Sequence, residues 1–273
     1  MVTATEDIEL ELLLEAIFKK YGYDFRNYAR SSLKRRVMQR LERSHLPNLS
    51  VMQHHVLTDP SFFGKLLLDM TINVTEMFRD PSFYLALREK VVPVLRTYPF
   101  FKIWHAGCAT GEEVYSMAIL LDEEGLLKNA MIYATDIDEV VLKKAREGIY
   151  ELDRIKDYTK NYQKAGGSGS FSDYYTANHK AAILNGRLKK HIVFAQHNLV
   201  TDSIFGEMNL IICRNVLIYF DRDLQNRVID LFQKSLVRRG ILCLGSKETL
   251  NFSSHRKIFD DFDEKEKIYR KNK

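Results

Sequence analysis

The chain has 273 residues, with 41 basic and 36 acidic side chains and a formal net charge of +5 when histidine is neutral. Apolar residues make up 45% of the sequence and charged residues 28%, which excludes disordered and fibrous chains and indicates a globular protein with a full core. A net charge of +5 is too small to indicate a nucleic-acid-binding protein by itself.

The N-terminal part of the chain is predicted to be helical. Apolar side chains recur there at steps of three and four residues, which is helical spacing: Leu10, Leu13, Leu14, Ile17, Leu33, Val37 and Leu41. Asp59-Pro60 and Asp80-Pro81 each predict a helix start, with aspartate as the N-cap and proline at the first helical position. We therefore expect a small all-helical N-terminal domain and then a linking helix, over residues 1–75 and 76–99.

From residue 100 onward, strand-like runs alternate with helical ones. Apolar runs predict strands in residues 101–108, 131–138, 191–199, 208–220 and 240–246. Helical patterns fill residues 114–125, 139–150 and 224–240. This alternation predicts a mostly parallel sheet with helices on both faces, so we expect an α/β domain over residues 100–273.

Residues 158–190 interrupt the alternation. The segment contains the run GGSGS, shows little periodicity, and is longer than an ordinary connection in such a domain. We expect an inserted loop or small subdomain, which is either a flexible surface insertion or a partner-contacting element.

A glycine-containing turn, AGCATGEE, follows the first predicted strand. Gly107 would let a ligand approach the backbone closely, which makes it a candidate cofactor-binding residue. The turn lacks the GxGxxG fingerprint and the lysine of a phosphate-binding loop. Glu112 and Glu113 would repel a pyrophosphate, which favours a cationic cofactor such as S-adenosylmethionine over NAD or ATP. The alternative is that the two glutamates only cap a helix.

The second predicted strand ends at two aspartates. Asp136 is the first carboxylate after the strand and could accept both hydroxyls of a ribose, whereas Asp138 is expected to be the N-cap of the next helix. An isolated aspartate at a strand end can also be only a cap. The glycine turn nearby favours the ligand interpretation for Asp136.

Five segments stand in a distinctive order along the chain: INVTEMFRD, AGCATGEEVYSMA, ATDID, HNL and CRNVLIYFD. Together they resemble the chemotaxis receptor methyltransferases of the CheR type. Met77 departs from that pattern, in which an aromatic residue is usual, and we expect a change of packing there without loss of function. The resemblance implies a class I S-adenosylmethionine-dependent methyltransferase, Rossmann-like with a mostly parallel seven-stranded sheet, behind a small all-helical N-terminal domain.

The same resemblance implies the reaction and the residues of the site. The reaction is protein-glutamate O-methylation on the cytoplasmic helices of chemoreceptors, with S-adenosylhomocysteine as the product. The implied cofactor-binding residues are Asn73, Thr75, Arg79, Glu113, Asp136, Asn198, Leu199, Arg214 and Asn215. Among these, Glu113 would hold the methionine or ribose part, Asn198 and Leu199 would flank adenine, and Arg214 with Asn215 would line the methyl-donor side.

Arg79 and Tyr219 are the expected catalytic residues. A glutamate carboxylate is ionised at neutral pH, so methyl transfer to it requires no general base, and positioning is the main task. Arg79 would orient the carboxylate and Tyr219 would shape the methyl pocket. The alternatives are an ion pair of Arg79 with Asp80 or Glu76 and a purely structural aromatic ring at position 219. The histidines show no metal-ligand spacing, so no metal is expected.

A basic helix in the N-terminal part provides candidate substrate-binding residues: Arg35, Arg36, Arg40 and Arg43. Chemoreceptor methylation helices are acidic according to the family resemblance, so this helix could steer them electrostatically. The alternatives are a solvated helix face and a weak nucleic-acid patch, and the scarcity of interleaved aromatic residues disfavours nucleic acid.

Cysteine spacing and the first residues predict a cytoplasmic protein that does not enter a membrane, and we also expect it to be a monomer. The three cysteines form no CxxC pair, which is typical of reduced core residues: Cys108, Cys213 and Cys243. The first residues, MVTATEDIEL, do not resemble a signal peptide. No apolar run approaches the roughly 20 residues that a membrane-spanning helix needs.

Two other functions stay open at this point. One is a non-catalytic adapter that binds S-adenosylmethionine and docks on a receptor array. The other is a small-molecule methyltransferase on the same fold. A DNA amino-methyltransferase is disfavoured, because the chain has RNVLIYF where such enzymes carry a proline-containing motif.

Overall fold

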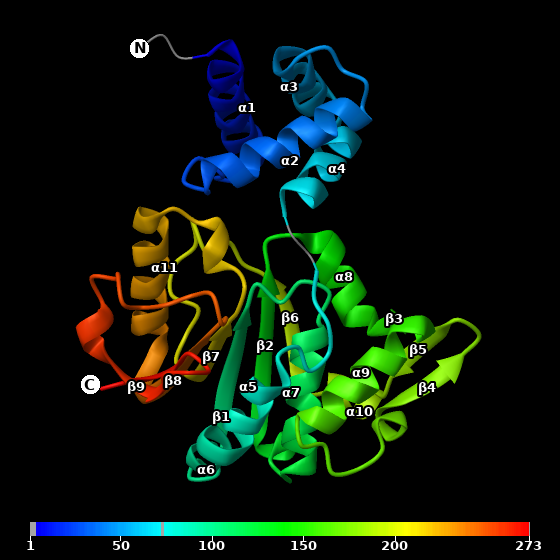
Figure 1. The fold of residues 1–273 in the computed structure, drawn as a ribbon, viewed down its shortest axis with the longest axis vertical. Helices are drawn as coiled ribbons and strands as arrows, with labels where there is room; N and C mark the ends of the chain where they lie inside the picture. Colours follow the sequence, from blue (N-terminus) through cyan, green and yellow to red (C-terminus); the bar gives the residue numbers. More distant parts are fainter. Residues whose placement is uncertain (1–3, 72–73, 273) are drawn as a thin grey trace.

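The computed structural model describes residues 4–71 and 74–272, and Figure 1 shows a helical domain above an α/β domain. The helical domain contains α1 (Thr5–Tyr21), α2 (Arg30–Arg43), α3 (Leu49–Thr58) and α4 (Pro60–Met70). The apolar positions predicted from helical spacing are all buried in one core cluster. Asp59 accepts a hydrogen bond from the backbone N–H of Ser61, which confirms it as the N-cap of α4.

The linking segment becomes helical at Pro81. It contains α5 (Pro81–Ala86), a π-helical turn (Leu87–Val91) and α6 (Val92–Leu95). Pro81 is the first helical residue, as predicted, and Asp80 occupies the N-cap position without the expected side-chain capping bond. Its backbone is left-handed, with φ of 56°, and its carboxylate makes no capping bond and instead pairs with Arg214. That ion pair places the start of the linking helix at the carboxyl end of β7 (Met208–Cys213).

The main sheet has seven strands, in the order β6-β2-β1-β7-β8-β10-β9. The strands are β1 (Phe101–Ala106), β2 (Ala130–Asp136), β6 (Ile192–Gln196), β7 (Met208–Cys213), β8 (Leu236–Leu244), β9 (Phe259–Asp263) and β10 (Ile268–Lys271). The first five strands in the spatial order are parallel, and β10 is antiparallel to both of its neighbours. The class I methyltransferase architecture expected from the sequence is confirmed. The strand predicted over residues 208–220 ends earlier, at Cys213.

Helices cover both faces of this sheet. The longer ones are α7 (Glu112–Glu123), α8 (Glu139–Glu147) and α11 (Arg222–Ser235), and short 3-10 turns lie at Leu127–Asn129, Leu217–Tyr219 and Arg256–Ile258. Side chains of α7 and of α11 belong to two separate apolar clusters, each with its own set of sheet residues. None of the helices in the described part of the chain is long and apolar enough to cross a membrane.

The interrupting segment folds as a small subdomain that begins earlier than predicted. It contains β3 (Ile149–Glu151), α9 (Leu152–Lys164), a 3-10 turn (Phe171–Tyr174), β4 (Tyr175–Asn178), β5 (Ala181–Leu184) and α10 (Gly186–Lys189). The strands form an antiparallel sheet in the order β3-β5-β4. Tyr158, Tyr162 and Phe171 are buried in the main core cluster, so the segment is not a flexible surface loop.

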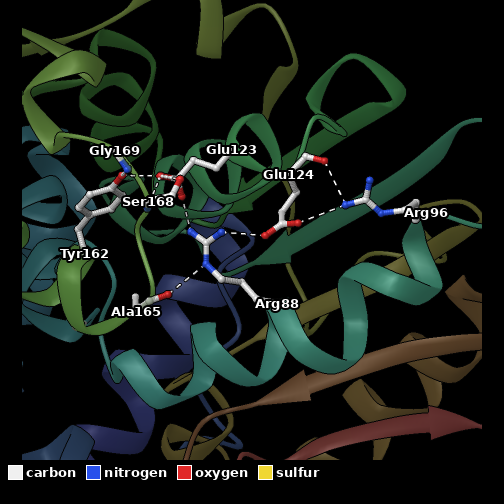
Figure 2. Close-up of polar contacts among 8 residues, drawn as sticks. All are labelled: Arg88, Arg96, Glu123, Glu124, Tyr162, Ala165, Ser168 and Gly169. Atoms are coloured by element: carbon white, nitrogen blue, oxygen red, sulfur yellow. Dashed lines mark hydrogen bonds and ion pairs between the residues drawn. The ribbon is translucent and has the colours of Figure 1, made fainter.

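One arginine ties the linking helices to the rest of the domain, as Figure 2 shows. Arg88 pairs with Glu123 and Glu124 at the end of α7, and its Nε donates to the Ala165 carbonyl oxygen at 3.1 Å. Glu123 in turn accepts hydrogen bonds from the subdomain: from the Tyr162 hydroxyl and from the Ser168 N–H and hydroxyl. The linking helices, α7 and the subdomain therefore meet around the ion pair of Arg88 and Glu123.

Candidate active site

A cavity opens at the carboxyl ends of β1, β2, β6 and β7, beneath the helical domain. Its empty volume is about 1000 Å³, including the part that opens to solvent. It lies where the order of the parallel strands reverses around β1, which is the usual ligand position in such sheets. Three parts of the chain supply its walls: the helical domain, the linker near Thr75, and the loops at the top of the sheet.

The glycine turn after β1 forms the floor of the cavity. Gly107 has a left-handed backbone with φ of 81°, and a Cβ at this position would lie only 2.5 Å from Cγ2 of Val216. Gly111 precedes α7 with φ of 91° and packs against Ala145 of α8. Larger residues would be strained at both positions. Glycine at 107 lets the turn approach the loop after β7, and glycine at 111 lets it approach α8.

Asp136 stands at the end of β2 with its carboxylate held by the backbone. Oδ1 accepts from the Asp138 N–H at 3.0 Å, and Oδ2 accepts from the Ala109 N–H at 2.9 Å. Burial raises the pKa of Asp136 to about 6, although these backbone bonds act in the opposite direction. The predicted cap role of Asp138 is confirmed, since its side chain accepts from the Val140 N–H at 2.8 Å. Of these two aspartates, Asp136 is the one that lines the cavity.

Arg214, directly after β7, is a buried cation between two acidic side chains. It donates to Glu113 at 2.9 Å and to Asp80 at 2.6 Å, and its guanidinium lies 4.0 Å from the ring centre of Phe83. His105 approaches the other Glu113 oxygen at 3.3 Å. Burial alone would raise the pKa of Glu113, but His105 and Arg214 outweigh it, so the pKa is lowered and the side chain is a carboxylate.

Arg36 and Arg79 face the cavity without such compensation. Arg79 donates to the Val74 carbonyl oxygen at 3.3 Å, and Arg36 donates to backbone oxygens at Ser32 and Met70. Within residues 4–71 and 74–272, neither guanidinium is within ion-pair distance of an acidic side chain, so the alternative of a salt bridge from Arg79 to Asp80 or Glu76 is wrong.

Tyr219, in the loop after β7, lies near these two arginines. Its ring centre is 5.4 Å from the Arg36 guanidinium, and burial raises the pKa of its hydroxyl. Tyr219 also contributes to the contact between the two domains, since its carbonyl oxygen accepts from the Ala29 N–H at 2.8 Å. The ring therefore faces the cavity at the end covered by the helical domain, and its role in shaping the methyl pocket stays a prediction.

The other arginines predicted to bind substrate do not line the cavity. Arg40 and Arg43 both pair with Asp69 of α4, and Arg35 is exposed. Only Arg36 reaches the cavity, because it lies on the buried side of α2 with Leu33 and Val37. A contact of Arg35, Arg40 or Arg43 with substrate stays a prediction.

Most of the predicted site residues meet at this cavity. Those that line it are Arg36, Thr75, Arg79, Gly107, Glu113, Asp136, Asn198, Leu199, Arg214, Asn215 and Tyr219. Asn73 lies outside the described residues. The sequence interpretation missed Tyr28, His197 and Val216, which also line the cavity. His197 and Val216 lie inside the motifs HNL and CRNVLIYFD, so the motifs could have indicated them, whereas nothing in the pattern around Tyr28 indicates its role.

The chain matches two family models. The "CheR methyltransferase, all-alpha domain" matches residues 8–71, and the "CheR methyltransferase, SAM binding domain" matches residues 73–268. The chain belongs to the CheR methyltransferase family. The second match covers the cavity residues of the linker and sheet, so the cavity lies in a domain of the S-adenosylmethionine-binding type.

Relatives of this CheR-family chain cover nearly its whole length. Cher3 of Pseudomonas putida, named as a methyltransferase, is 51% identical over 266 residues, which are 97% of each chain. The chemotaxis protein methyltransferase of Listeria monocytogenes is 27% identical and aligns with 89% of this chain and 92% of its own. That of Salmonella typhimurium is 28% identical, over 92% of this chain and 86% of its own.

Proposed function

We propose that this CheR-family protein transfers a methyl group from S-adenosylmethionine to the carboxylate of a glutamate on a chemoreceptor cytoplasmic helix, leaving S-adenosylhomocysteine. The family match and the names of the chemotaxis methyltransferase relatives support the reaction class. The observation that carries the proposal is the pair of cavity-facing guanidinium groups, Arg36 and Arg79, without acidic partners among the described side chains.

The cavity chemistry fits the cofactor. The Asp136 carboxylate suits the ribose hydroxyls, and the glycine turn at Gly107 leaves room for close approach. Asn198 and Leu199 would flank adenine, in a loop held by the Val200 N–H, which donates to Asn198 Oδ1 at 2.9 Å. When bound, the cofactor supplies an electrophilic methyl group on a sulfonium.

The buried acidic residues explain why a positive cofactor is tolerated. Glu113 and Asp136 lie on the sheet side of the cavity, and Glu113 is held as a carboxylate by His105 and Arg214. A sulfonium is stabilised next to such charges, whereas a pyrophosphate is repelled. Arg214 and Asn215 would line the methyl-donor side.

The two guanidinium groups without acidic partners among the described side chains support a carboxylate substrate. One can pair with the carboxylate of the cofactor's methionine part, and the other can orient the carboxylate of the incoming glutamate. Because a glutamate is already ionised near neutral pH, no base is needed to activate it. The arginine must orient without binding too tightly, since the negative charge disappears as the ester forms.

A methyl-transfer assay tests the proposal. The protein is incubated with methyl-tritiated S-adenosylmethionine and receptor cytoplasmic fragments, and the label on the receptor is treated with base. We expect incorporation that base releases as methanol, as for a glutamate methyl ester. Label that resists base, or label only in a small-molecule acceptor, would contradict the proposal, and cofactor binding without transfer to any receptor would favour the adapter alternative.

A further inference from the structure

Glu248, in the loop after β8, lies outside the motifs considered so far, yet its carboxylate is one of the most heavily hydrogen-bonded groups near the cavity. Its exposed fraction is 4%. Oε1 accepts from the N–H groups of Val216 and Ile218 at 2.9 and 3.3 Å. Oε2 accepts from the N–H groups of Asn215, at 3.0 Å, and Gly245. Three of these four donors belong to the loop after β7.

That loop carries much of the cavity wall. Asn215, Val216 and Tyr219 all line the cavity, and Val216 packs against the glycine turn at Gly107. Asn215 has a left-handed backbone with φ of 61°, which is uncommon for a residue with a side chain. A loop with such a residue needs outside contacts to keep its conformation. Glu248 supplies three of them from a neighbouring strand end.

The surrounding structure makes room for this carboxylate. A Cβ at Gly245 would lie 2.8 Å from Glu248 Oε2 and 2.8 Å from the Asn215 backbone nitrogen. Glycine at this position therefore allows the carboxylate to reach the loop. A carboxylate matches four N–H donors because both of its oxygens only accept, whereas a glutamine would turn an NH₂ group toward donors.

We infer that Glu248 is a positioning residue, which fixes the backbone from Asn215 to Tyr219 so that this loop is shaped for the cofactor and for methyl transfer. The inference rests on the proposed function of the same cavity. Glu248 does not line the cavity and acts through the loop alone. Burial raises the pKa of Glu248, whereas the four backbone hydrogen bonds to its carboxylate act in the opposite direction.

The first test compares Glu248→Gln with Glu264→Gln, a matched change on the exposed turn between β9 and β10. In Glu248→Gln we expect faster backbone amide exchange in residues 214–220 by mass spectrometry. We also expect S-adenosylhomocysteine to bind about tenfold more weakly by calorimetry, because misplaced loop atoms lose contacts of ~1.4 kcal/mol. Glu264→Gln should match wild type in both measurements.

A second variant covers the case in which Glu248→Gln does not fold. Gly245→Ala keeps the carboxylate but displaces it, and should weaken binding in the same direction, whereas Gly186→Ala, with open space around its Cβ, should not. Either folded loop variant binding S-adenosylhomocysteine within about threefold of wild type would overturn the inference. Wild-type protein that binds this product but methylates no receptor would instead refute the proposed function and leave the positioning role standing.

Discussion

At the scale of single residues, the site is distinguished by which charges are compensated. Arg214 is paired with Glu113 and Asp80, so its positive charge is balanced within the protein. Arg36 and Arg79 have no acidic partner among the described side chains and donate to neutral oxygens instead. Sequence motifs singled out Arg79, Asp136 and Tyr219, which line the cavity, because each lies within a contiguous motif. Their roles toward cofactor and substrate stay predictions. The motifs did not identify Glu248, because its contacts come from the packing of two separate loops.

Replacing Arg79 by alanine tests the orienting role. Loss of one charge-assisted hydrogen bond of ~2 kcal/mol should lower the methylation rate by about 30-fold in a folded variant. Arg238→Ala, at an exposed position on β8, is the control and should keep the wild-type rate. Circular dichroism verifies folding, and a folded Arg79→Ala protein that methylates receptor within a few-fold of wild type would remove Arg79 from the mechanism.

The raised pKa of Asp136 predicts a pH dependence of cofactor binding. Ribose hydroxyls donate to the ionised carboxylate, so binding requires the deprotonated form. With a pKa of about 6, most of the free protein has lost this proton by about pH 7 but keeps it at about pH 5. Affinity for S-adenosylhomocysteine should therefore fall about tenfold between about pH 7 and about pH 5. Calorimetry measures this, and Asp136→Asn should bind weakly with no such dependence; equal affinities of wild type at both pH values would contradict the assignment.

At the scale of elements, a strand can be predicted from the sequence when both of its faces are buried. The buried parallel strands were predicted because they are continuous apolar runs, whereas β9 and β10 were missed because FDDFD and IYRK are largely polar. The strand predicted over residues 208–220 was too long, because Leu217 and Phe220 pack into the cluster around α11 after the strand has ended. The subdomain begins before residue 158, because Ile155, Tyr158 and Tyr162 recur at helical steps on the buried side of α9, a signal that starts ahead of the predicted segment.

The contacts of Arg88 predict a large effect on stability at this scale. Its side chain is 12% exposed and the partner Glu123 is 4% exposed, so removing the arginine leaves a buried carboxylate unpaired. Arg88→Ala should lower the free energy of unfolding by about 3 kcal/mol. Arg96 pairs with the same Glu124 but is 55% exposed, so Arg96→Ala should cost less than about 1 kcal/mol. Urea unfolding compares the two, and equal losses would mean that the pairing in Figure 2 does not hold the linker.

At the scale of the whole molecule, the cavity exists only where the two domains meet. The loop after α1 contacts the loop before α11: the Asp221 N–H donates to the Asn27 carbonyl oxygen at 2.9 Å, and the rings of Tyr28 and Phe220 are 4.9 Å apart. Each domain could be predicted from its own periodicity. The contact between the two domains could not be predicted from the sequence, because it depends on which loops pack against each other.

Tyr28→Ala tests how much this contact between the domains contributes to cofactor binding. Tyr28 lines the cavity from the helical domain, and loss of its ring contacts, worth about 1 kcal/mol, should weaken S-adenosylhomocysteine binding about fivefold. Tyr21 is the matched control: its ring stacks on Phe63 at 3.8 Å within the same domain, away from the cavity. Tyr21→Ala should lower stability but not affinity. The same loss of affinity in both variants would assign the effect to the fold of the helical domain.

The central claim is that the cavity between the glycine turn and Asp136 holds the cofactor. Titration calorimetry of S-adenosylhomocysteine into the folded wild-type protein measures this most directly. We predict saturable binding with one molecule per chain, and loss of that binding in Asp136→Ala and not in Asp260→Ala, an exposed aspartate on β9 outside the cavity. No heat of binding with well-folded wild-type protein, or unchanged binding in Asp136→Ala, would contradict the account.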